Sequence, residues 1–242
     1  MYSKTVKALI LLLLATSHKT FPFAYVFRFY YHTIIGLFMS RTKYLQTKKN
    51  SFGYNSPQHL FKWITLKSRV SPLELDMYFH KSNSTYFLDL DIARTKLLTR
   101  ILQNFWWYSY DNESGRNKKP REIKNFPYTP VATVQCRFIR ELKPFQKFNI
   151  SSRILAWDNK WLFVLSKFTT QKNKKGEEVL NAIALTKYVF KSGRITVPPK
   201  EALSICGFLN EENEIINQKN IKLVESLVNV EDLEKVFQFV DS

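Results

Sequence analysis

The fold is decided by the stretch Ser82-Asn-Ser-Thr-Tyr-Phe-Leu-Asp-Leu-Asp-Ile-Ala-Arg-Thr-Lys-Leu-Leu-Thr-Arg-Ile-Leu102. Ser82 and Asn83 are residues favoured at helix N-termini, and neither Gly nor Pro interrupts the sequence behind them. Apolar residues then recur at helical spacing, at Tyr86, Leu90, Ala93, Leu97 and Ile101. Other apolar side chains extend around much of the remaining cylinder. The pattern therefore predicts a long helix over residues 86–102 that is mostly buried.

Short runs rich in β-formers flank this helix. One run precedes it at 61–70, and four follow it in close succession, at 131–140, 148–157, 161–170 and 178–190. Short links between successive strands favour antiparallel neighbours. The sequence therefore predicts an α+β fold in which one helix covers a curled antiparallel sheet, with the last four strands forming a meander. Residues 103–129, aromatic and then charged, are predicted to form a long lid or binding loop.

The distribution of charge along the chain is more informative than the net charge. The 242 residues contain 37 Lys+Arg and 20 Asp+Glu, a net charge of +17. Residues 1–73 contain no acid, residues 74–200 are moderately basic, and residues 201–242 are acidic. The net charge first indicates a nucleic-acid partner, but no RNA-binding motif accompanies it, so we do not expect nucleic acid as a partner. Cys136 and Cys206 form neither a disulfide framework nor a metal-ligand set, and we predict no metal and no cofactor.

The head, residues 1–40, is apolar and basic. It contains a leucine-rich run and a second, aromatic-rich stretch that carries Arg28, a costly residue at the centre of a bilayer. We favour a membrane anchor that lies at the interface. A cleaved secretory signal ending near Ala15 and a mitochondrial presequence are alternatives. A buried N-terminal helix is a weaker alternative, because the eleven cations of residues 1–73 have no acids near them in the sequence.

The remaining parts follow from composition. Residues 41–60 are predicted to be a basic linker, 61–200 a folded domain, and 201–242 an acidic helical tail. Within that tail, apolar residues at helical spacing predict an amphipathic helix over Ile221–Val240. This helix would cap the sheet or meet a partner.

The residues that lead into the buried helix carry a recognisable series of motifs. The series runs through an acidic pair, a His, an Asn, a Tyr and an acidic-x-Ala-Arg end, at Glu74, Asp76, His80, Asn83, Tyr86 and Asp91-x-Ala93-Arg94. It resembles the hotdog-fold acyl-CoA thioesterases of the 4-hydroxybenzoyl-CoA thioesterase type. The likeness is greatest to the membrane-linked subgroup of animals and fungi, which shares the head motif of Pro22–Arg28 and the motif of Gly193–Glu201.

The resemblance implies a hotdog domain over residues 61–200 and an acyl-CoA thioesterase activity. It places the catalytic carboxylate at Asp76 and the oxyanion donor at the backbone N–H of Asn83, with His80 as an accessory catalytic group. It also places Glu74, Phe79 and Tyr86 at the substrate. Acyl-CoA is then the substrate, and a homodimer with the site at the subunit interface is expected. We expect membrane association, with the mitochondrion favoured over the ER membrane or the secretory route.

The pattern also departs from the family. Glu74 replaces the usual Asp, Phe79 stands where Gly is common, and Ser82 stands where an Asn is usual. We expect the bulky Phe79 to narrow or fill the acyl pocket. A catalytically silent hotdog protein that binds lipid or serves assembly is therefore the alternative function, in which Asp76 caps a turn and His80 is structural. A set of cations in the middle of the chain is expected near CoA phosphates: Lys143, Lys147, Arg153, Lys172, Lys174 and Lys175.

Overall fold

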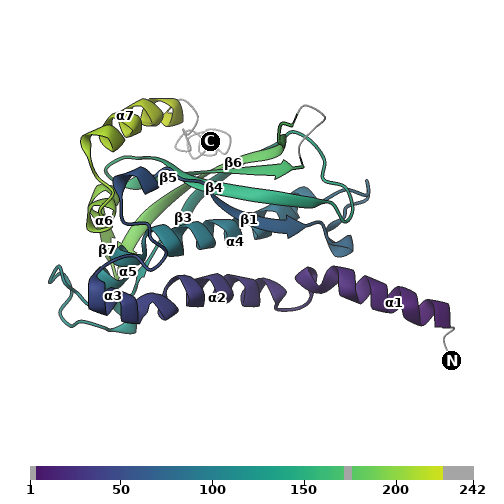
Figure 1. The fold of residues 1–242 in the computed structure, drawn as a ribbon, viewed down its shortest axis with the longest axis horizontal. Coiled ribbons are helices and arrows are strands. Elements are labelled where there is room, and N and C mark those ends of the chain that lie inside the picture. The colour runs from purple at the N-terminus through teal and green to yellow at the C-terminus, as the bar shows by residue number, and fades with distance from the viewer. Residues whose placement is uncertain (1–3, 172–175, 226–242) are drawn as a thin grey trace, which may run out of the picture.

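The computed structural model describes residues 4–171 and 176–225, and its centre is helix α4, Asn83–Ile101 (Figure 1). Each member of the predicted apolar stripe of α4 is at most 2% exposed. The predicted long buried helix is therefore confirmed. Phe87 and Leu88 differ from the expectation, since they are 38% and 50% exposed near the N-terminal end.

An antiparallel sheet of seven strands curls around α4. The strands are β1 (Ile64–Arg69), β2 (Pro127–Tyr128), β3 (Val131–Phe138), β4 (Lys147–Trp157), β5 (Trp161–Thr170), β6 (Val179–Ser192) and β7 (Ile195–Val197). The main order is β1-β4-β5-β6, and β2, β3 and β7 each pair with β6. Register shifts interrupt the β3–β6, β4–β5 and β5–β6 ladders, and such irregularities bend strands and increase twist. The predicted α+β class is confirmed.

The predicted meander is only partly correct. Strands β4, β5 and β6 are sequential neighbours, but β3 pairs with β6 instead of β4. Both edges of β4 are already occupied, by β1 and β5, so β3 lies against the other side of β6. The link at 139–146 crosses the N-terminal end of α4, where Leu142 is fully buried and accepts the backbone N–H of Lys81 at 2.9 Å.

The first part of the segment after α4 is not the open loop that we predicted. Helix α5, Gln103–Tyr110, begins directly after α4 and buries three of its five aromatic residues. Phe105, Trp106 and Trp107 are at most 5% exposed and belong to the main core with β6. The aromatic cluster forms helix here because its side chains fill the space between the end of α4 and the sheet.

The head forms two helices, α1 (Lys4–Ser17) and α2 (Ala24–Gly36), followed by α3 (Arg41–Thr47). Figure 1 shows α2 beside α4, on the side away from the sheet, with α1 projecting beyond the domain. Residues 41–60 are not a simple linker, because Tyr44, Asn50 and Leu60 are buried.

The charge argument against a packed head was wrong. Its cations find acids that lie far away in the sequence. Within the head, Lys19 and Arg28 reach Asp89, and in the segment after it Arg41 reaches Asp111 and Lys48 reaches Glu113. The domain supplies these partners through tertiary contacts, which local sequence cannot display.

No single helix in the described parts of the chain is long and apolar enough to cross a bilayer. The two segments Lys4–Thr20 and Ala24–Thr47, bent by 47° at their junction, satisfy the length and composition criteria only as a pair.

Two helices follow the sheet, α6 (Pro199–Ile205) and α7 (Glu211–Glu225). Helix α7 lies on the outer face, where the side-chain amide of Asn217 bonds to both backbone groups of Trp157. Val224 is buried there, whereas Leu223, part of the predicted stripe, is 59% exposed. The rest of the predicted tail helix, residues 226–240, lies outside the described residues.

Candidate active site

The loop between β1 and α4 carries most of the predicted site residues. It begins with the 3-10 turn Pro72–Glu74, which is closed by a capping box between Ser71 and Glu74. The backbone N–H of Asp76 donates to the carbonyl of His80 at 3.0 Å, and Phe79 donates back to Asp76 at 3.1 Å. These bonds close a tight turn over 76–80 directly before the helix.

Asp76 and His80 form a pair at this turn. Asp76 Oδ1 accepts the backbone N–H of Tyr78 at 2.9 Å, and Oδ2 lies 3.3 Å from His80 Nδ1. The other imidazole nitrogen, Nε2, lies 3.5 Å from Glu141 Oε1. The two side chains are 28% and 24% exposed, so both are held in place while remaining open to a ligand. The predicted carboxylate and histidine are thus adjacent.

The N-terminus of α4 shares a cavity with His80, whereas Asp76 does not line that cavity. Asn83 is the first residue of the helix, and the backbone N–H groups of a first helical turn have no intrahelical acceptor. A cavity of about 180 Å³ opens at this end, lined by His80, Lys81, Asn83, Tyr86, Phe138, Ile139, Arg140 and Glu141. The helix end therefore offers donors and a positive dipole to an oxyanion in that cavity.

Glu74 does not contact this cavity, contrary to our expectation of a substrate contact. Its carboxylate is 3% exposed and lies 2.9 Å from Lys81 Nζ and 2.8 Å from Lys19 Nζ. Lys81 Nζ also lies 3.0 Å from Asp89, and Arg28 reaches the same carboxylate at 3.0 Å. We call these five residues the buried charge cluster. Glu74 is structural, because its carboxylate is bonded to Lys19, Lys81 and the backbone N–H of Ser71.

The cluster favours the ionised form of the Asp89 carboxylate despite its burial. Burial alone would raise the pKa of Asp89, but Lys19, Lys81 and Arg28 outweigh it and lower that pKa to about 2. Lys19 belongs to the head, whereas Glu74 and Lys81 flank the Asp76 turn on either side. The cluster therefore joins the head directly to the loop that carries Asp76.

The two predicted aromatic residues have different positions. Tyr86 lines the cavity and packs against Phe138 and Phe168, and burial raises the pKa of its hydroxyl. Phe79 is 78% exposed and does not line the cavity at Asn83, so within this chain it neither narrows nor fills that cavity. Its φ of +60° explains why Gly is common at this position, since that conformation carries no steric cost for Gly.

The cations expected near CoA phosphates are separated in space. Lys147 lines a cavity of about 820 Å³ between the head and the β1 edge, together with Lys67 and Arg69. Arg153 instead stacks over Trp63 on the sheet, 5.2 Å from the ring centroid. Lys143 is exposed in the link before β4. Lys172, Lys174 and Lys175 lie outside the described residues.

The family model of the thioesterase-like superfamily matches residues 70–204, which include the Asp76 turn, α4 and the sheet from β2 to β7. The chain belongs to this superfamily. Its curled antiparallel sheet around one helix is the hotdog arrangement that the motifs predicted for a chain of this superfamily.

One relative extends the likeness beyond the residues that the family model matches. A probable thioesterase of Saccharomyces cerevisiae is 42% identical over 217 residues, covering 87% of this chain and 84% of that protein. The thioesterase lcsJ of Purpureocillium lilacinum is 40% identical over 69% of this chain, which spans only 55% of that protein. Protein THEM6 of Xenopus laevis is 29% identical over 114 residues, 47% of this chain and 48% of that protein.

Solved structures of the superfamily are more distant. The probable thioesterase YbaW of Escherichia coli has a TM-score of 0.46 at 16% identity, covering 59% of this chain and 95% of that one. The 4-hydroxybenzoyl CoA thioesterase of Pseudomonas sp. strain CBS-3 has a TM-score of 0.42 at 17% identity, covering 60% and 99%.

Sequence reasoning missed the buried charge cluster and Glu141. The signal for Asp89 was its position between Leu88 and Leu90 on a helix predicted to be buried, where an acid requires a partner. Nothing local could have identified Lys19 as that partner, because it lies 70 positions away. Among residues 4–171 and 176–225, no group of three or more His, Cys, Asp or Glu could hold a metal ion.

Proposed function

We propose that this thioesterase-like chain is a membrane-associated enzyme that hydrolyses fatty acyl-CoA thioesters. The observation that carries the proposal is the pairing of the Asp76 carboxylate with His80, whose side chain lines the cavity at the N-terminus of α4 together with Asn83. Thioester hydrolysis needs a nucleophile or base on one side of the carbonyl and an oxyanion donor on the other. The relatives named as thioesterases support the same reaction class.

In this mechanism the Asp76 carboxylate removes a proton from water as the water oxygen attacks the thioester carbonyl carbon. The carbonyl oxygen becomes an oxyanion and accepts a hydrogen bond from the backbone N–H of Asn83. The C–S bond then breaks, the carboxylic acid forms, and the thiolate of CoA takes up the proton. His80 holds Asp76 in orientation through the 3.3 Å contact. Direct attack by Asp76, through an anhydride that water then hydrolyses, uses the same atoms.

Hydrolysis of acyl-CoAs of several chain lengths by purified protein tests the proposal. We expect Asp76→Asn to lower kcat/KM by at least about 100-fold, the usual contribution of a general base. Asp158→Asn is the matched control, because Asp158 also accepts the backbone N–H of the residue two positions later, at 2.7 Å. Its activity should be unchanged. If Asp76→Asn releases CoA as fast as the wild type, Asp76 is not the catalytic carboxylate.

One observation favours the silent alternative. Asp76 Oδ1 caps its own turn through Tyr78, which is the structural role that a non-catalytic Asp would have. A protein of this kind would bind acyl-CoA without turnover. The two functions separate in the same experiment, because a silent protein releases CoA at the uncatalysed rate in both wild type and Asp76→Asn.

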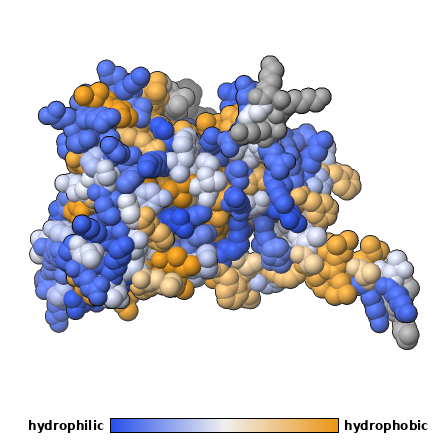
Figure 2. All heavy atoms as spheres, viewed as in Figure 1, coloured by the Kyte–Doolittle hydropathy of each residue, from blue (hydrophilic) through white to orange (hydrophobic). Residues whose placement is uncertain are grey.

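Membrane association rests on the outer surface of the head. Large apolar side chains of α1 and α2 are exposed, including Leu11 at 66%, Phe27 at 74% and Tyr31 at 59%. Figure 2 shows hydrophobic atoms gathered over α1 and along the lower face below α2. Lys67, Arg69 and Lys147 lie beside them, and cations next to an apolar helix suit an anionic lipid surface. Carbonate extraction tests this proposal: release of all the protein into the soluble fraction would contradict it.

A homodimer is supported by the position of β3 at an edge of the described sheet. Within that sheet β3 pairs only with β6, and an edge strand can serve as a template for a strand of another chain. The end of β3, Phe138, also lines the cavity at Asn83. We expect sedimentation to give twice the mass of the 28.7 kDa chain, and a monomer at micromolar concentration would contradict the dimer.

We also propose the mitochondrion as the location, with the ER membrane or the secretory route as the alternative, which fractionation can test.

A further inference from the structure

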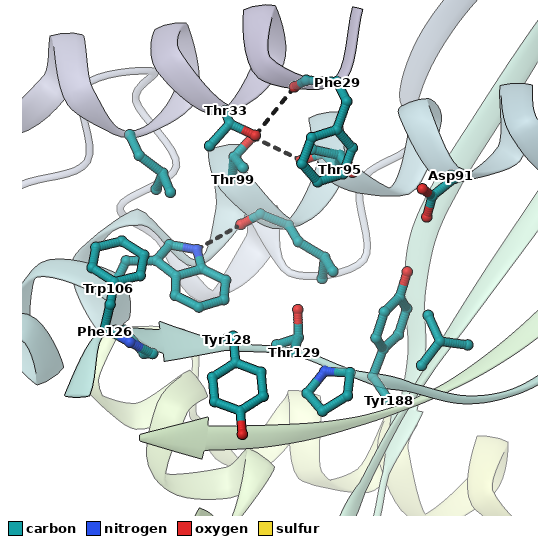
Figure 3. A pocket seen from close by; sticks show the side chains of 15 residues that line it. Phe29, Thr33, Asp91, Thr95, Thr99, Trp106, Phe126, Tyr128, Thr129 and Tyr188 are labelled. Carbon is teal, nitrogen blue, oxygen red and sulfur yellow. Dashed lines mark hydrogen bonds between the residues drawn. The ribbon is translucent and has the colours of Figure 1, made fainter. Parts of the chain in front are cut away.

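A second cavity, of about 440 Å³, lies between the head and the domain (Figure 3). Its walls come from α2, α4, α5, β6 and the segment 126–131. Figure 3 shows Asp91 at one end and Trp106 with Phe126 at the other. The volume lies within the range of ligand pockets, which is roughly 300–1,000 Å³.

The cavity has a buried interior and an accessible mouth. Leu37, Leu98, Trp106 and Tyr188 are each at most 5% exposed, whereas Tyr128 and Val131 are 50% and 42% exposed. The interior residues lie deep between α2, α4 and the sheet, and the exposed ones lie at the β2–β3 corner. A ligand would therefore enter past the corner and reach an apolar interior.

The polar groups in the wall are mostly bonded within the protein. Thr33 Oγ1 donates to the carbonyl of Phe29 at 3.1 Å, Thr99 Oγ1 to that of Thr95 at 2.7 Å, and Trp106 Nε1 to that of Leu98 at 3.4 Å. Asp91 is bonded to Arg94 and Tyr25 at one end. The middle of the cavity thus offers a ligand apolar surface, with a polar boundary at one end.

Helix α2 separates this cavity from the outer apolar surface. Its residues Phe29, Thr33 and Leu37 face the cavity at intervals of four, the last at the helix C-terminus. Phe27 and Tyr30, by contrast, are 74% and 55% exposed on the same helix. A helix with an apolar face on each side places the cavity next to any hydrocarbon layer that the head contacts.

We infer that this cavity binds a long hydrocarbon chain, supplied by a free fatty acid or by a bilayer lipid. A hydrocarbon chain matches the apolar wall, because it requires no hydrogen bond that the wall cannot give. The cavity is separate from the proposed thioester site, since it shares no lining residue with the cavity at Asn83. Chain binding does not require that Asp76 hydrolyse anything, so the inference goes beyond the proposed function.

Energy transfer from protein tryptophan to parinaric acid tests the inference, because Trp106 forms part of the wall. The full chain on phosphatidylcholine vesicles is titrated with free parinaric acid in one arm and with parinaroyl phosphatidylcholine in the other. If the cavity binds the chain of the probe used in an arm, we expect energy transfer in that arm to saturate. Unlabelled palmitate should then abolish the transfer, because it competes for the same cavity. Saturable transfer with free parinaric acid alone identifies a free fatty acid as the ligand. Transfer from parinaroyl phosphatidylcholine that palmitate abolishes identifies the chain of a bilayer lipid.

Two variants fill the cavity from different walls, Thr33→Phe on α2 and Thr129→Phe on the β2–β3 segment. Each should weaken saturable binding at least tenfold while the protein still unfolds cooperatively. If one fails to fold, the other carries the test. Thr42→Phe is the control, since Thr42 is exposed on α3 and lines neither cavity. Two results would overturn the inference. One is that the folded Thr33→Phe and Thr129→Phe variants bind the probe as well as the control and the wild type. The other is that the wild type shows no saturable binding in either arm.

Discussion

Lys19 and Asp89 are the residues that connect the head to the candidate active site. Lys19 Nζ lies 2.8 Å from carboxylate oxygens of both Glu74 and Asp89, and it also donates to the carbonyl of Arg69 at 2.9 Å. Lys81 repeats the bridge between the same two acids from the other side. Buried charges remain ionised only when paired, so the position of each member depends on the others.

Lys19→Met should therefore destabilise the protein by about 3 kcal/mol, because it leaves two buried carboxylates short of a cation. Urea unfolding of the full chain measures this change. Lys7→Met on the exposed face of α1 is the control and should leave the free energy of unfolding unchanged. Equal stability of the two variants would show that the contact of Lys19 is not maintained in solution.

The pKa of Asp89 predicts a pH dependence of stability. A carboxyl whose folded pKa is about 2, below its ordinary value near 4, stabilises the fold above pH 4 and loses that contribution as the pH falls toward 2. The contribution is about 2 kcal/mol. We expect the difference in unfolding free energy between wild type and Asp89→Asn to shrink across this window. A difference that is constant from pH 7 to 2 would contradict the depressed pKa.

Helices α2 and α4 pack through a close approach at Gly36. A Cβ atom at this position would lie 2.4 Å from Thr99 Oγ1, and the glutamine side chain of Gln103 donates to the Gly36 carbonyl. The hydroxyl of Thr99 is in turn bonded within α4. The contact requires a residue without a side chain, which fixes the distance between head and domain.

The substitution Gly36→Ala tests this contact, because two opposing effects predict changes of opposite sign in the stability of the protein. Helix propensity alone predicts that Ala stabilises α2 by roughly 1 kcal/mol. The overlap with Thr99 predicts the reverse, a loss of about 1–3 kcal/mol as the helices are forced apart. Thermal unfolding distinguishes the two, and a raised Tm would show that α2 does not pack on α4 as described.

At the scale of the whole molecule, four layers lie in sequence: α7, the sheet, α4 and α2 (Figure 1). The match to the family model begins at residue 70, so α2 lies outside the matched residues. Helix α2 supplies one wall of the proposed hydrocarbon cavity and the cation of Arg28, while Lys19 before it and Arg41 after it also pair with domain acids. Loss of the head would expose one side of α4.

Two truncations make this prediction measurable. A chain that starts at Thr16 keeps Lys19 and Arg28 and should unfold within a few degrees of the full chain. A chain that starts at Arg41 loses both cations and the α2 layer, and its Tm should fall by more than about 10 °C, in line with the loss of several kcal/mol. Equal stability of the two truncations would show that α2 is dispensable.

Local sequence alone predicted the buried helix, five of the seven strands of the described sheet, and the placement of Asp76, His80 and Asn83 around the helix start. These features are local, because spacing, turn residues and motif order lie within a few residues of one another. Other features became visible only in the tertiary structure. They are the pairing of β3 with β6, the acidic residues that pair with Lys19 and Arg28, the structural role of Glu74 and the outward position of Phe79. The reason is that strand partners and buried ion pairs join residues tens of positions apart. Their choice depends on which edges and surfaces remain unoccupied once the helix and sheet have packed.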